Sequence, residues 1–113
     1  MKLFPLIAGS LALVAGSAAL AADGSIDAGR QKNSTCVGCH GIPDYKTAYP
    51  VVYAVPRIGG QHAKYLASAL QAYKNGDRKH PTMRAIAASL SEQDMADLAA
   101  YYAAQGGTQT AAK

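Results

Sequence analysis

The sequence is poor in the large aromatic residues that usually fill a protein core. It contains no tryptophan, and its single phenylalanine is Phe4, so seven tyrosines are the only aromatic side chains in the rest of the chain. Such a small domain needs something beyond its own apolar side chains to complete its interior. A disulfide, a metal or a large apolar cofactor are the usual solutions.

Charged residues are also scarce. They make up 16% of the chain, and the formal net charge is +4. A protein that binds DNA or RNA through many phosphate contacts carries a much stronger basic signature, so we exclude nucleic acid as a partner. The mild positive excess is compatible with an acidic protein partner.

The first 21 residues have the features of a secretion signal. Lys2 provides the positive start, Leu3–Leu20 is apolar and uncharged, and Ala19-Leu20-Ala21 matches an A-x-A cleavage pattern. The alternative is an uncleaved membrane anchor, but proline, glycine and serine within the stretch disfavour a membrane-spanning helix. We therefore expect a signal peptide over 1–21 and export to the periplasm.

The rest of the sequence predicts helices joined by irregular loops, and we find no strand pattern long enough for a sheet. Apolar spacing and capping residues predict four helical segments: Ser25 or Asp27 toward Cys36, Gln61–Lys74, Ala85–Ala88, and a last helix after a capping box at Ser91 and Asp94. Prolines and glycines predict a loop over 41–60 and a turn over 78–84. We expect one all-α domain over 22–105 and a flexible tail over 106–113.

Both cysteines lie in one pentapeptide, Cys36-Val37-Gly38-Cys39-His40. A disulfide between them would close too small a loop to add much stability. The C-x-x-C-H pattern is that of haem c attachment. Two thiols on one helical turn can form thioethers to both vinyl groups of one porphyrin, and the adjacent imidazole can bind the iron. The pattern therefore predicts one haem c held by Cys36 and Cys39, with His40 as an axial ligand.

Two other uses of a C-x-x-C segment fit this sequence less well. A thiol-disulfide oxidoreductase places the motif beside a βαβ pattern, and no strands are predicted here. A zinc site needs four ligands, and beyond the pentapeptide only His62 and His80 remain, without a second C-x-x-C.

The second axial position has four candidate ligands. Met95 falls on the apolar face of the last helix, where methionine usually fills the core. His62 begins a helix and is expected to be partly exposed, and His80 is expected to be exposed because of its charged and proline neighbours. Met83 lies in a proline-containing loop that can bend over the porphyrin, and Met/His is an established ligand pair. We expect Met83, with His80 or an open position as alternatives.

Several segments together resemble class I cytochromes c, in particular the bacterial c553 and c4-type group, over about Ile26 to Ala104. The segments that carry the resemblance are Cys36 to His40, Pro56 to Gln61, Met83, Ala87 to Ser91 and Asp97 to Tyr102. The resemblance implies a small helical shell around one covalently attached haem. It also implies that the first and last helices cross near Gly29, with an aromatic such as Tyr101 packed there.

The resemblance assigns roles to three further residues. The carbonyl of Pro56 is expected to accept a hydrogen bond from the second ring nitrogen of His40, which would fix the ring. Arg57 and Gln61 are expected to reach a haem propionate, with a charge-assisted bond from the arginine.

The loop from Ile42 to Val55 departs from the family pattern, because it is long and rich in tyrosine and proline. One hypothesis is that Tyr45, Tyr49 or Tyr53 covers a haem edge or bonds a propionate, since a buried phenol needs a polar partner. The alternative is simple exposure on a surface loop.

Four basic residues cluster in sequence around Met83: Lys74, Arg78, Lys79 and Arg84. They form either an ordinary solvated surface or a basic collar that steers acidic redox partners toward the haem edge.

The function implied by the resemblance is that of a periplasmic mono-haem electron carrier between redox proteins, with His/Met-ligated low-spin iron, and not of an enzyme. A haem-based ligand-binding or sensing domain is one alternative. A small cytochrome subunit of a larger dehydrogenase or oxidase, with a membrane complex as partner, is another. We expect a monomer.

Overall fold

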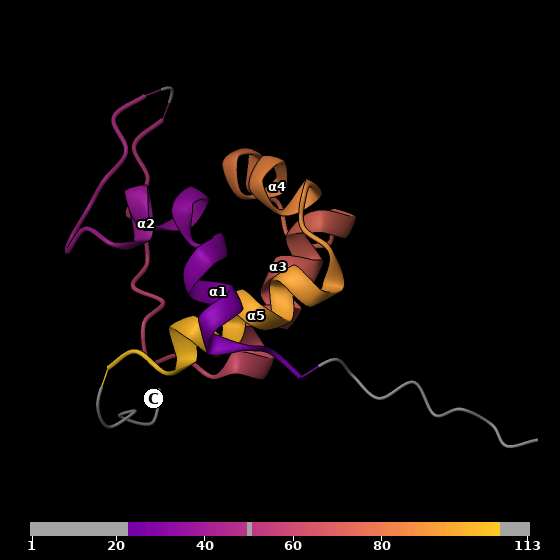
Figure 1. Ribbon diagram of the computed structural model, residues 1–113. Helices are drawn as coiled ribbons and strands as arrows, with labels where there is room; N and C mark the ends of the chain where they lie inside the picture. Colours follow the sequence, from indigo (N-terminus) through magenta and orange to yellow (C-terminus); the bar gives the residue numbers. More distant parts are fainter. Residues whose placement is uncertain (1–22, 50, 107–113) are drawn as a thin grey trace, which may run out of the picture.

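The computed structural model describes residues 23–49 and 51–106. The predicted signal peptide and all but the first residue of the predicted tail lie outside these ranges. Five helices follow one another along the described chain: α1 (Ile26–Lys32), α2 (Ser34–His40), α3 (Ala63–Asn75), α4 (Pro81–Ala88) and α5 (Glu92–Ala103). Figure 1 shows α1 lying against α5, and α3 beside α4.

The all-α prediction is confirmed for this part of the chain. The described residues contain no strand, and a single isolated bridge joins Lys46 to Ala54 within the 41–60 loop. No helix among them is both long and apolar enough to cross a membrane.

The N-terminal helix starts as predicted but is interrupted before the cysteines. Ser25 caps α1, with its Oγ accepting the N–H of Ala28 at 3.2 Å. The chain then breaks at Asn33 and α2 begins at Ser34, so the prediction of one continuous helix was wrong. At the break, the Asn33 side chain accepts a hydrogen bond from the Tyr102 hydroxyl of α5. Asparagine disfavours a helix interior because its side chain competes for such bonds.

The crossing of α1 and α5 implied by the family resemblance is present. Gly29 lies directly against the Asp97 backbone and the Tyr101 side chain, and a side chain at this position would have no space. The two helices are also joined by Lys32, whose Nζ lies 2.6 Å from Asp97 and 2.8 Å from Asp94. The N-terminal segment is therefore held firmly on the last helix.

The capping box of α5 is confirmed. The Ser91 hydroxyl accepts the N–H of Asp94 at 3.1 Å, and the Asp94 carboxylate accepts the N–H of Ser91 at 2.9 Å. Leu90 and Met95 on either side pack into the same core. That core is small, as the scarcity of large apolar residues predicts; its buried apolar members are Leu66, Ala87, Leu90, Met95, Leu98, Ala99 and Tyr102.

The predicted end of the helix over Gln61–Lys74 is confirmed to within one residue. Helix α3 ends at Asn75, and Gly76 follows with φ of +89°. That left-handed conformation favours glycine and stops the helix.

The following turn differs from the prediction. Helix α4 begins at Pro81, so Met83 lies inside a helix and not in a loop. Proline fits the first helical position because its missing N–H has no partner there anyway.

Candidate haem site

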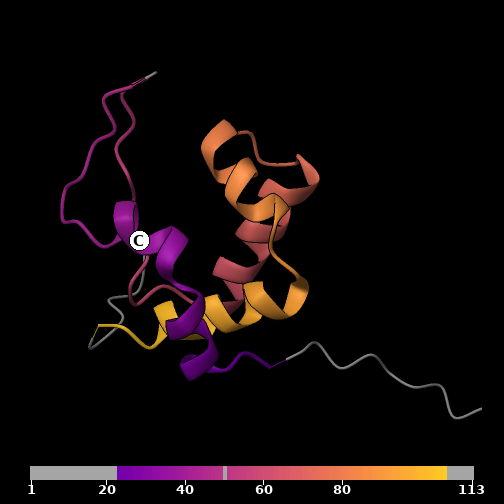
Figure 2. The same ribbon diagram turned by 45° about the horizontal axis from the view of Figure 1, so that its top comes forward.

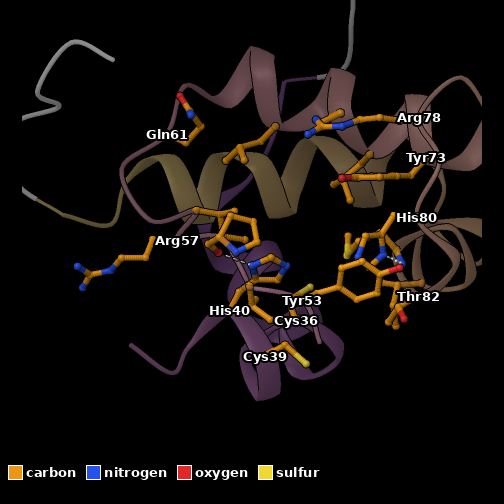
Figure 3. A pocket seen from close by; sticks show the side chains of 18 of the residues that line it. Cys36, Cys39, His40, Tyr53, Arg57, Gln61, Tyr73, Arg78, His80 and Thr82 are labelled. Carbon is orange, nitrogen blue, oxygen red and sulfur yellow. Dashed lines mark hydrogen bonds between the residues drawn. The ribbon is translucent and has the colours of Figure 1, made fainter. Parts of the chain in front are cut away.

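A single cavity of about 370 Å³ collects the chemistry-bearing residues of the sequence. All seven residues predicted for the site are among those lining it: Cys36, Cys39, His40, Pro56, Arg57, Gln61 and Met83. Most of the other lining residues are apolar or aromatic, and Figure 3 shows their side chains converging from the loop and the helices. The cavity lies between α2 and α4, which both ribbon views place on different sides of the molecule (Figures 1 and 2).

The two cysteines are presented by α2, as expected from their spacing. Both are free thiols and half-buried. Burial raises the pKa of the Cys36 thiol, and the nearby Thr35 and Tyr102 hydroxyls oppose this only partly. Cys36 also packs against the apolar core, to which α5 contributes most of the buried side chains.

His40 is the last residue of α2, and one of its two ring nitrogens is hydrogen-bonded to the backbone. Its Nδ1 lies 2.8 Å from the carbonyl oxygen of Pro56, the contact drawn as a dashed line beside His40 in Figure 3. Because a carbonyl can only accept, Nδ1 carries the proton. The lone pair of the neutral ring is then on Nε2, where a metal ion can bind it.

The four candidates for the second axial ligand lie in different surroundings. Met83 lines the cavity from α4 and is half-buried. Met95 is 2% exposed and belongs to the core, as predicted. His62 is exposed at the start of α3 and does not line the cavity. Among the methionines of the described chain, Met83 is thus the one that reaches the cavity.

His80 differs from the prediction, since it is half-buried and not exposed. Its ring centroid lies 4.6 Å from that of Tyr53 and 6.3 Å from that of Tyr73. Its Nδ1 accepts the N–H of Met83 at 3.3 Å, so the proton of the neutral ring is on Nε2. This tautomer is the opposite of that of His40, because the Nδ1 lone pair of His80 accepts the Met83 N–H.

Arg57 and Gln61 lie at the edge of the cavity. In Figure 3 the Arg57 side chain points away from the other labelled residues. The Gln61 side-chain oxygen accepts the N–H of His62 at 2.9 Å. Both line the cavity, and their predicted contact with a propionate remains a prediction.

An arginine that sequence analysis placed only in the basic collar also lines the cavity. The Arg78 guanidinium lies 4.9 Å from the centroid of the Tyr73 ring and donates to the Tyr65 hydroxyl at 3.3 Å. The spacing of Tyr65 and Tyr73, eight positions apart on α3, was a signal that both share one helical face.

The three loop tyrosines have different environments. Tyr53 lines the cavity, whereas Tyr49 is 90% exposed and Tyr45 is half-buried away from the lining. The alternative of simple exposure therefore applies to Tyr49.

These residues fit a covalently bound haem. Two thiols on one helical turn, an imidazole with a free Nε2 and a thioether on the opposing helix all face one mainly apolar cavity. In contrast, the described residues include no group of three or more histidine, cysteine, aspartate or glutamate side chains placed to hold a metal ion. The zinc alternative thus has no ligand set in this part of the chain.

Comparison with known proteins agrees with this assignment. The family model for cytochrome c matches residues 26–104. The chain is 42% identical to cytochrome c-554(548) of Halomonas halodenitrificans over 85 residues, which cover 73% of this chain and 98% of that protein. It is 38% identical to cytochrome c4 of Pseudomonas aeruginosa over 97 residues, which cover 85% of this chain and 46% of that protein.

A third relative is the thiosulfate dehydrogenase electron acceptor of Stutzerimonas stutzeri, 33% identical over 78 residues, which cover 66% of this chain and 34% of that protein. The chain thus spans nearly all of the first relative and less than half of the other two. With a helical fold and a cavity suited to haem c, this similarity shows that the chain belongs to the cytochrome c family, as a class I c-type cytochrome that carries electrons and is not an enzyme.

Proposed function

We propose that this protein is a periplasmic mono-haem electron carrier whose low-spin iron is bound by His40 and Met83. The observation that supports this most is that one cavity is lined by both residues, although they are far apart in the sequence and belong to different helices. Haem c bound there supplies a one-electron redox couple. Cys36 and Cys39 hold it covalently, which prevents its loss by dilution outside the cytoplasm.

Residues around the cavity explain why His40 and Met83 would both stay bound to the iron in either oxidation state. The Pro56 carbonyl restrains the ring of His40 through the 2.8 Å contact at Nδ1 and strengthens the donation of Nε2. The Met83 thioether is a soft ligand that favours ferrous iron, so it raises the reduction potential relative to a second imidazole. With His40 and Met83 both bound to the iron, the protein would accept and release an electron without exchanging ligands.

The proposed location follows from the N-terminal pattern. Residues 1–21 have the charge, apolar stretch and cleavage motif of a secretion signal. Release of a haem-stained protein of mature size by osmotic shock would support a periplasmic location, whereas its retention in the membrane fraction would indicate an uncleaved anchor.

We propose that the partners are redox proteins with acidic docking surfaces. Residues 33–90, which include every residue that lines the cavity, contain seven basic and two acidic side chains. The flanking segments 23–32 and 91–106 contain two basic and five acidic side chains. A dehydrogenase is a candidate electron donor, because one relative is named as the electron acceptor of thiosulfate dehydrogenase.

The ligand assignment is tested with Met83→Ala in protein made with a cytochrome maturation system. We expect this variant to lose the weak ferric thioether-to-iron band, to drop in reduction potential and to bind carbon monoxide when reduced. The measurements are optical spectra in both oxidation states and a potentiometric titration.

Met95→Leu is the matched control, because Met95 is buried in the core and does not line the cavity. It should keep the band and the potential of the wild type. A thioether band that survives in Met83→Ala would refute the assignment. Rapid carbon monoxide binding by the reduced wild type would instead favour a ligand-sensing domain.

A further inference from the structure

We propose that Tyr53 and His80 act together as a support that holds Met83 in position, with His80 capping α4 and Tyr53 holding the ring of His80. This inference rests on the proposed function, since it concerns Met83 as an iron ligand. It assigns to His80 the role of a positioning residue and not of a ligand.

The first part of the support is the cap of α4. The helix begins at Pro81, and the N–H of Met83 is one of the donors that find no partner inside its first turn. His80 has extended backbone, as a capping residue requires, and its Nδ1 accepts this N–H at 3.3 Å. Because the capped residue is Met83 itself, the hydrogen bond restrains the backbone from which the thioether projects.

The second part is the environment of the His80 ring. It lies against Tyr53, with the centroids 4.6 Å apart and the planes tilted by 50°, and meets Tyr73 of α3 edge-on at 6.3 Å. Figure 3 shows Tyr53 beside His80 and Thr82. Two aromatic rings thus limit the rotation of the imidazole that caps α4.

Tyr53 can restrain another ring because its own backbone is held in place. Its N–H donates to the Thr47 hydroxyl at 2.9 Å, and its carbonyl accepts the Thr47 N–H at 2.9 Å. The N–H of Val55 also donates to the Tyr45 carbonyl at 2.9 Å, so the two arms of the loop are paired. Tyr53 therefore links the loop that follows the cysteines to the helix that carries Met83.

The consequence is competition between Met83 and external ligands. Loosening the Tyr53–His80 support should make Met83 easier to displace. Imidazole is a suitable probe because it binds ferric haem iron and abolishes the thioether band, and optical titration of the ferric holoprotein measures its affinity.

His80→Ala should raise imidazole affinity about five-fold, because a helix N-cap is typically worth about 1 kcal/mol and 1.4 kcal/mol is a tenfold change. His80→Asn should restore wild-type affinity, since asparagine is a good N-cap. Tyr53→Ala should raise the affinity about three-fold, the effect expected of losing one aromatic pair.

A double mutant distinguishes this support from a general structural effect. Tyr53 acts through the ring of His80, so Tyr53→Ala should have no further effect in the His80→Asn background. Tyr49→Ala is the matched control, because Tyr49 lies in the same loop but is 90% exposed. It should bind imidazole as the wild type does.

The failure of this inference is separable from that of the proposed function. If Met83→Ala loses the thioether band while Tyr53→Ala and His80→Ala bind imidazole like the wild type, the support does not exist and the ligand assignment stands. If Met83→Ala keeps the band, the proposed function itself is wrong. If His80→Ala fails to accumulate, Tyr53→Ala decides the question alone. Tighter imidazole binding by this variant supports the proposal, and wild-type binding refutes it.

Discussion

At Gly29 the backbone of α1 passes so close to α5 that no side chain fits between the two helices. A Cβ atom there would lie 2.1 Å from the carbonyl oxygen of Asp97 and 2.6 Å from the Cβ atom of Tyr101. Neither atom can move aside by a side-chain rotation. Gly38, between the two cysteines, is the opposite case, with no heavy atom within 4 Å of such a Cβ.

The two glycines should therefore respond oppositely to alanine. Gly29→Ala should lower the free energy of unfolding by about 3 kcal/mol or more, because the helices must separate. Gly38→Ala should raise it by about 0.5–1 kcal/mol, because alanine restricts the unfolded chain and favours a helix. Guanidinium unfolding of the holoproteins, followed by circular dichroism, measures both. A Gly29→Ala protein as stable as the wild type would contradict the close crossing.

At the scale of helices, the contact between α1 and α5 depends on one lysine and two carboxylates. Lys32 holds the pKa of Asp94 at about 2, with further help from the Ser91 N–H and hydroxyl. Lys32 also lowers the pKa of Asp97, which accepts the N–H of Ser25 at 2.8 Å and is almost fully buried. The same carboxylates raise the pKa of Lys32.

These shifts predict how stability depends on pH. A carboxylate with a lowered folded pKa adds stability that is fully present well above the ordinary value of 3.8 and is lost as the pH falls toward 2. Asp94→Asn keeps a capping oxygen but removes the charge. We therefore expect this variant to be less stable than the wild type at neutral pH, with the difference shrinking between about pH 4 and pH 2.

Urea midpoints measured across this range test the prediction, because urea is uncharged and does not screen the ion pair. Asp27→Asn is the control, because Asp27 is exposed and makes only a 3.4 Å ion pair with Arg30. It should stay close to the wild type throughout. A gap between Asp94→Asn and the wild type that remains constant down to pH 2 would show that the ion pair does not link the helices.

At the scale of the whole molecule, charge is distributed unevenly along the fold. The segment that builds the cavity is predominantly basic, whereas residues 91–106, which form α5, carry three acidic side chains and no basic one, and the acidic and basic side chains of 23–32 balance. Lys79 and Arg84 are exposed near the start of α4. This distribution favours the approach of negatively charged reactants to the cavity side, in spite of a net charge of only +4.

Electron transfer should therefore depend on the charge of the reactant. Oxidation by anionic ferricyanide should slow as ionic strength rises, and oxidation by a cationic cobalt complex should accelerate. Reversing Lys79 and Arg84 to glutamate should slow the ferricyanide reaction at low salt by about tenfold. Stopped-flow kinetics measure these rates. Arg30→Glu on α1 is the control for the single reversals Lys79→Glu and Arg84→Glu, because each changes the net charge by two. An equal effect of all three would attribute the dependence to net charge alone.

Features that depend on neighbouring residues were readable from the sequence. The attachment pentapeptide, the Ser91–Asp94 capping box and the Asn75-Gly76 helix end each involve residues within a few positions of one another. The residues that form each of these features lie within about one helical turn of one another. The order of residues in the sequence is therefore enough to predict them. The contact between His40 and Pro56 was foreseen only through the family resemblance, because it joins a helix to a distant loop.

Other features were decided by tertiary contacts. The break at Asn33 coincides with a hydrogen bond from Tyr102, and the half-buried position of His80 depends on Tyr53 and Tyr73. The His80 ring that accepts the Met83 N–H is itself positioned by these two distant tyrosines. The sequence by itself therefore determined the helical class and the haem attachment chemistry. Only the packing of distant segments decided how Met83 is presented to the cavity, because contacts between residues far apart leave no periodic pattern in the chain.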